Sequence, residues 1–175
     1  MKKKTLALVL ALTLLVAGVV GGTLAWLTDR TAEVKNTFTV GDINIGLTET
    51  TTDYKMVPGN TIAKDPTVTV KANSEACWLF VKVTESENLD TFITYAIADG
   101  WTKLQDGVYY REVPASNADQ TFPVLAGNTV TVNSDVTKEM LTAKDFANPT
   151  LTFQAYAIQK AHFDTPAAAW AEVSK

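Results

Sequence analysis

His162 is the only histidine among the 175 residues, so a zinc site of the His-Glu-x-x-His type, which needs two imidazoles on one helical face, is excluded. A Gly-x-Ser-x-Gly nucleophile elbow is absent as well. Composition alone does not exclude a Ser-His-Asp triad, but His162 stands beside Phe163 at the base of an expected terminal helix. The sequence therefore predicts no catalytic residue, no metal site and no cofactor, and we expect a protein that is not an enzyme.

Three acidic residues lie close together in the sequence, at Glu85, Glu87 and Asp90. Carboxylate oxygens bind calcium, but a dedicated calcium loop alternates its acidic residues and includes a glycine, and that order is missing here. Solvated surface charge is therefore the better interpretation of this cluster.

Large aromatic side chains offer another kind of chemistry, because their rings can form a platform that binds sugars. In a domain without an internal disulfide, however, large rings more often build the core. A carbohydrate-binding surface stays open as the alternative to an aromatic core. The residues concerned are Trp78, Trp101, Tyr109, Tyr110 and Trp170.

Cys77 is the only cysteine, so an intramolecular disulfide is impossible. Its neighbours Trp78, Leu79 and Phe80 predict a buried thiol. An intermolecular disulfide remains an alternative. A secreted domain of this composition must depend on its core or on partners for stability.

The N-terminus has the order of a secretory signal. Lys2, Lys3 and Lys4 precede an apolar run over residues 6–20, and small residues follow up to Ala25. We expect cleavage between Ala25 and Trp26, so that residues 1–25 form a signal peptide and the protein is secreted. An uncut membrane anchor is the alternative, since about 20 apolar residues can span a bilayer.

Residues 26–175 are the length of one ordinary domain with room for a core. Without the three lysines of the signal, 12 basic side chains face 19 acidic ones, which gives a net charge of −7. An acidic protein of this kind is unsuited to binding nucleic acid through its phosphates.

Short, threonine-rich apolar runs separated by turn residues predict a mainly β domain. Asp106-Gly107 is a strong hairpin signal. Asn73-Ser74-Glu75 and Gly127-Asn128 are interpreted as further hairpin connections. In the late strand "TLTFQAYAIQ", alternation puts Leu151, Phe153, Ala155 and Ala157 on one face. About eight strands at this spacing indicate an antiparallel jelly roll or β-sandwich.

Two short helices are expected among the strands. The stretch "TKEMLTAKDFANP" is the best candidate for a helical crossover. Near the C-terminus, Thr165 is typical of an N-cap and Pro166 of a first helical position, followed by a run of alanines. This terminal helix would place Trp170 on the sandwich.

Cleavage after Ala25 would free an N-terminal arm of about residues 26–38. Its apolar residues Trp26, Leu27, Val34 and Phe38 alternate with polar and charged ones. A β domain buries such an arm either against its own sheet or against the open edge of a neighbour. In the second case the contact is head-to-tail and generates an open filament.

The junction resembles that of the TasA/camelysin family of Gram-positive secreted proteins, whose precursors are cut by a SipW-type signal peptidase. The similarity lies in "GTLAWLTD" followed by "NTFTVGDINIGLTE", and extends through "MVPGNTIAKDPTVTVKANSEACWLFVKV" to the late "AYAIQ" and "AAAW". The resemblance implies a jelly-roll domain, export, and assembly into biofilm-matrix fibres by an N-terminal arm that completes the next subunit's sheet.

By position, that role would fall to the stretch that begins at Trp26 and extends through Phe38. Camelysin-type members are described as metallo-endopeptidases, but the zinc ligands are missing from this sequence. We therefore expect a secreted or cell-surface matrix protein that polymerises with itself, alone or with other matrix proteins or an accessory, anchoring protein. The alternatives are a monomeric module that binds polysaccharide or a host surface, and a camelysin-like peptidase.

Overall fold

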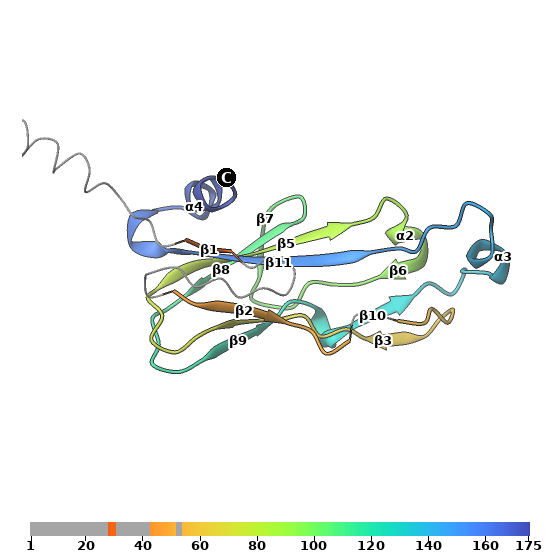
Figure 1. Ribbon diagram of the computed structural model, residues 1–175, viewed down its shortest axis with the longest axis horizontal. Coiled ribbons are helices and arrows are strands. Elements are labelled where there is room, and N and C mark those ends of the chain that lie inside the picture. The colour runs from red at the N-terminus through yellow and green to blue at the C-terminus, as the bar shows by residue number, and fades with distance from the viewer. Residues whose placement is uncertain (1–27, 31–42, 52–53) are drawn as a thin grey trace, which may run out of the picture.

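The computed structural model describes residues 28–30, 43–51 and 54–175. The described chain is mainly β and forms two facing layers of antiparallel strands (Figure 1). The larger layer is a five-stranded sheet in the order β1-β11-β5-β8-β7. Its strands are β1 (Thr28–Arg30), β5 (Cys77–Glu85), β7 (Thr102–Gln105), β8 (Val108–Val113) and β11 (Leu151–Gln159).

The second layer is built from two three-stranded sheets, β2-β4-β9 and β3-β10-β6. A backbone hydrogen bond from Lys64 N to Asn128 O (2.8 Å) extends the β3–β10 pairing, and one from Val124 N to Pro66 O (2.9 Å) extends the β4–β9 pairing. The two sheets therefore lie end to end, joined where the chain runs from β3 into β4 and from β9 to β10. The strands are β2 (Ile45–Thr48), β3 (Thr61–Ala63), β4 (Thr67–Val70), β6 (Ile93–Thr94), β9 (Gln120–Pro123) and β10 (Thr129–Val132).

Helices are few and short. They are α2 (Leu89–Phe92), α3 (Lys138–Leu141), α4 (Pro166–Val173) and the 3₁₀ turns η1 (Ala126–Asn128) and η2 (Lys160–His162). The Thr137 hydroxyl caps α3 and the Thr165 hydroxyl caps α4, each accepting from a backbone N–H at 3.3 Å. Both predicted helices, including the Thr165-Pro166 start, are confirmed.

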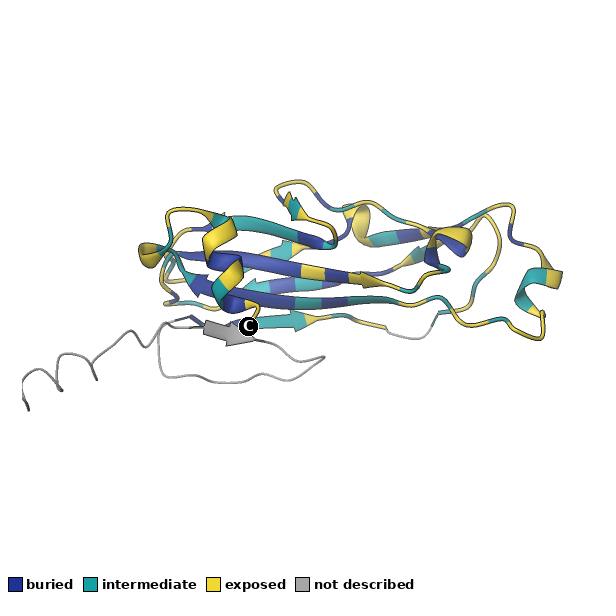
Figure 2. Cartoon of the chain, turned by 90° about the horizontal axis from the view of Figure 1, so that it is seen from above, coloured by how far each residue is buried: buried dark blue, intermediate teal, exposed yellow. Residues whose placement is uncertain are grey.

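Strand periodicity divides the apolar side chains of the large sheet between two clusters. On β11, Phe153, Ala155 and Ala157 face the main core between the layers, as predicted. Tyr156 and Ile158 face the opposite side and pack with Trp170 of α4. The buried residues therefore form bands along the strands, whereas exposed residues gather at turns and helix surfaces (Figure 2). The antiparallel β-sandwich is confirmed, and the jelly-roll connectivity stays a prediction.

One of the three predicted hairpins is confirmed. β7 and β8 pair across Asp106-Gly107. The Asn73–Glu75 hairpin is wrong, because the chain there crosses from β4 in one layer to β5 in the other. The Gly127-Asn128 hairpin is also wrong: both residues have positive φ angles, 62° and 54°, but β9 and β10 lie end to end and pair with β4 and β3.

Candidate assembly site

The N-terminal arm meets the domain at β11, the strand next to the edge strand β1. Along one side β11 pairs with β5 over its whole length. Along the other side β1 pairs with it antiparallel, Thr28 opposite Ile158, Asp29 opposite Ala157 and Arg30 opposite Tyr156. The described part of the arm therefore forms a ladder of three residue pairs within its own chain.

The residues predicted for cleavage and assembly flank this ladder. Ala25, Trp26, Leu27, Val34 and Phe38 lie outside the described residues, as does the proposed signal peptide. Of the two predicted modes of burial, the described segment adopts the one in which the arm lies against its own sheet. The sequence did not indicate that β11 would be the partner, because no local pattern links positions at opposite ends of a chain.

Helix α4 closes the outer side of this edge. It lies across the outer face of the large sheet at the end where β1 pairs, in contact with β1, β5 and β11 (Figure 1). The Trp170 ring meets the Tyr156 ring edge to face, with centroids 5.1 Å apart, and the Phe80 ring at 5.3 Å. Trp170 therefore packs on the same β11 residue that stands opposite Arg30 in the ladder.

A largely buried ion pair lies beside the part of β11 that does not pair with β1. The Lys64 ammonium is 2.7 Å from Glu49 Oε1, and their side chains are only 9% and 17% exposed. The same nitrogen lies 5.4 Å from the centre of the Phe153 ring and 5.0 Å from that of Tyr54. Burial and the hydrogen bond to Glu49 raise the pKa of Tyr54. The pair neutralises charge where the two layers meet beside β11.

The residues examined for catalysis do not form a site in the described chain. His162 is exposed on η2, and Glu85, Glu87 and Asp90 are exposed. Within residues 28–30, 43–51 and 54–175, no three His, Cys, Asp or Glu side chains are grouped so as to hold a metal ion. Cys77 is fully buried as predicted, and burial raises the pKa of its thiol to about 12.

The tryptophans of the described residues belong to the interior. Trp78, Trp101 and Trp170 are each at least nine-tenths buried. The indole N–H of Trp78 donates to Phe163 O at 3.0 Å, and that of Trp101 donates to Pro123 O at 2.8 Å. The rings of these three tryptophans therefore pack inside the domain, in agreement with the predicted aromatic core.

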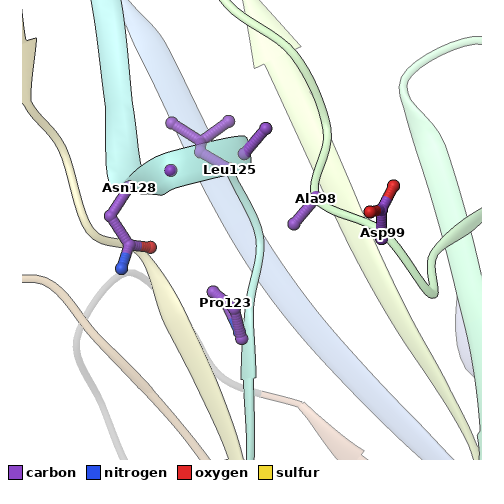
Figure 3. Close-up of a pocket in the computed structure, with 7 residues that line it drawn as sticks. Ala98, Asp99, Pro123, Leu125 and Asn128 are labelled. Atoms are coloured by element: carbon purple, nitrogen blue, oxygen red, sulfur yellow. The ribbon is translucent and has the colours of Figure 1, made fainter.

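A shallow pocket of about 350 Å³ lies where the second layer is interrupted. Ala98 and Asp99 line one side, and Pro123, Leu125 and Asn128 line the other (Figure 3). Asp99 is its one charged residue, and the rest of the lining is Ala126 and Gly127. Beside Asp99 the lining holds only the Asn128 amide and small or apolar groups, so no second acid, base or nucleophile accompanies the carboxylate in a constellation for catalysis.

The fold defines the chain as an antiparallel β-sandwich whose N-terminal strand completes the edge of the larger sheet. No family model, curated protein or solved structure matches the chain. In the part of the chain that the structure describes, no helix combines the length and apolar character needed to cross a membrane.

Proposed function

We propose that this is a secreted structural protein that forms extracellular matrix fibres by head-to-tail donation of its N-terminal arm. In the fibre, the arm of one copy pairs with β11 of the next copy in place of that copy's own arm. The observation that carries the proposal is the position of β1, a three-residue strand from the chain's N-terminal region at the edge of a five-stranded sheet.

Exchange of β1 between copies preserves the contacts that it makes. A swapped element forms the same pairs between molecules as within one, so its exchange costs little beyond the association itself. The ladder of three pairs is also weak, because each backbone hydrogen bond contributes only about 0.5–1.5 kcal/mol net. Release of β1 would expose the β11 edge, and an exposed edge strand readily pairs with another chain.

The length of the arm matches the length of the acceptor strand. Continuing the register of β1 in a donated strand places Leu27 opposite Gln159 and Lys35 opposite Leu151, the two ends of β11. Residues of equal parity share a face of a strand, so Trp26 and Val34 would lie on the same side. A donated arm of residues 26–35 would therefore cover the whole edge.

Export and assembly are coupled in this proposal. A SipW-type signal peptidase would cut between Ala25 and Trp26, and the arm is free for donation only after the apolar segment is removed. Other matrix proteins or an anchoring protein could start or hold the fibre. The mass of the protein recovered from the culture medium tests this step, and a mature N-terminus far from Trp26 would contradict it.

The direct test compares the mature chain, residues 26–175, with a chain that lacks residues 26–35. Electron microscopy and size-exclusion chromatography of the purified proteins should give fibres for the first and monomers for the second. A third chain with residues 26–35 in shuffled order controls for the mere presence of an extension. Equal assembly of all three chains would exclude donation of the arm, and monomers throughout would favour a monomeric binding module.

A disulfide trap identifies the acceptor. Asp29 and Ala157 are register partners, and directly opposed strand residues have Cβ atoms about 4.5–5.5 Å apart, close to disulfide distance. Two Cys77→Ala chains, one with Asp29→Cys and one with Ala157→Cys, are mixed before oxidation. Donation predicts a mixed dimer on a non-reducing gel, whereas a permanently self-paired arm gives none.

A further inference from the structure

The strand β1 lies against the β11 edge and against the helix α4. β11 supplies backbone pairing, as in any sheet. The helix supplies a second surface, on the outer side of the same edge. A three-residue edge strand has few hydrogen bonds of its own, so a second surface contributes a large share of what holds it.

Helix α4 itself depends on docking. Its eight residues are too few to form a stable helix alone in water. One side of the helix is buried on the large sheet through Ala169, Trp170 and Val173. The other side is exposed at Ala167 and Ala168. Changes on the exposed side therefore alter helix stability without removing a packing contact.

The chain between β11 and α4 is fixed at several points. Lys160 N donates to Ala76 O at 2.8 Å, and Lys160 forms an ion pair with Glu112 of β8. The carbonyl of Phe163 accepts from the Trp78 indole at 3.0 Å. Only the residues after Phe163 can swing away while β11 keeps its place, so α4 can undock without loss of the sheet.

We propose that α4 and the β11 edge form one composite site for the arm strand, and that docking of α4 controls how long an arm stays bound there. Trp170 connects the two halves of this site, because its ring packs on Tyr156, the β11 residue opposite Arg30. The occupant is the chain's own segment 28–30 in the monomer and, resting on the proposed function, the same segment of a second copy in the fibre.

The test measures hydrogen exchange of peptides that contain residues 28–30 in the mature monomer. Trp170→Ala should accelerate their exchange by about tenfold or more, which corresponds to a loss of roughly 1.4 kcal/mol or more in arm binding. Ala168→Gly, which lowers helix stability from the exposed side, should accelerate it to a smaller extent. Trp170→Phe should restore most of the protection.

Phe92→Ala is the matched control, because Phe92 is buried in the main core and packs on Phe146 with ring centroids 5.5 Å apart. It removes an aromatic ring but leaves α4 untouched. Its exchange at residues 28–30 should stay within about twofold of the parent under conditions where the variants remain folded. Equal acceleration by Phe92→Ala and Trp170→Ala, or unchanged exchange in Trp170→Ala, would overturn the proposal.

The disulfide trap separates this proposal from the proposed function. Mixed dimers should form faster in the Trp170→Ala background if α4 holds the arm. Absence of mixed dimers in every background, together with accelerated exchange in Trp170→Ala, would refute arm donation but leave the composite site intact. Mixed dimers that form at the same rate in both backgrounds would refute control by α4 and retain donation.

Discussion

The two edges of the large sheet are closed in different ways. At one edge, β7 is joined to its neighbour β8 by the Asp106-Gly107 turn, and its pairing is irregular between Lys103 and Gln105. Lys103 and Asp106 place exposed charges along it. At the other edge, β1 comes from the far end of the chain and pairs over three residues beneath α4.

The β7 edge carries the features by which β proteins prevent association, namely a charged lysine, an irregular strand and a tight connection. The β1 edge is instead covered by a three-residue strand from a distant part of the chain. The β7 edge is therefore poorly suited to accept a second chain, whereas the β11 edge would accept one if β1 is exchanged as proposed. The difference indicates which side of the domain is suited to assembly.

The largest loss of stability is expected when the aromatic ring on which α4 packs is removed. Phe80 is fully buried and contacts the Trp170 ring. Phe80→Ala should lower the free energy of unfolding by about 3–5 kcal/mol, the usual cost of deleting a core aromatic ring. Urea unfolding measures this cost, and the exposed change Val57→Ala should stay within about 0.5 kcal/mol of the parent. A loss well below this range would mean that the cluster of Phe80, Tyr156 and Trp170 on the outer face of the sheet contributes little to stability.

Gly107→Ala tests the β7 edge. Gly107 has a φ of +69°, and a Cβ there would lie 2.6 Å from the Val83 carbonyl oxygen. We expect a loss of about 2–4 kcal/mol, combining left-handed strain with a steric clash. Gly59→Ala is the control, because its φ is +75° but no atom lies within 4 Å of the added Cβ. Thermal unfolding of both variants isolates the clash, and equal losses would contradict it.

Thr165→Ala is a milder test of the sheet edge at which β1 pairs. Loss of the N-cap should cost about 1 kcal/mol of helix stability and accelerate exchange of the arm. Thr137→Ala removes the equivalent cap of α3 and should leave the arm unchanged, because α3 lies at the opposite end of the molecule (Figure 1). Urea unfolding measures the loss of stability in both variants, and hydrogen exchange measures the protection of residues 28–30. Equal acceleration of exchange in Thr165→Ala and Thr137→Ala would contradict a specific link between α4 and the arm.

The smallest effect concerns the charges of the β7 edge. The hydrogen bond and charge of Lys103 lower the pKa of Asp106. A lowered folded-state pKa means that the pair stabilises the fold above the unfolded-state pKa and that this stabilisation is lost as pH falls through the folded-state pKa. Asp106→Asn should therefore differ from the parent at neutral pH and converge with it in acid. NMR titration of the Asp106 carboxyl checks the direction of the pKa shift.

Local sequence signals predicted the elements better than their partners. Thr165-Pro166 marked the start of α4, and the alternation of β11 gave its core-facing residues, because both depend on neighbours in the chain. Gly127-Asn128 gave a turn but not a hairpin, since positive φ angles do not determine which strand pairs with which. The arm was identified from its composition, whereas its contact with α4 depends on packing between the two ends of the chain.

The positions of α4 and α3 decide where the protein can be labelled. Lys175 lies just after α4, on the side of the molecule where β1 pairs (Figure 1). A fluorescent protein or affinity tag fused there would crowd the arm, and its effects would be mistaken for those of the protein itself. The exposed residues 142–145, which follow α3 at the far end, are the safer place for an inserted tag.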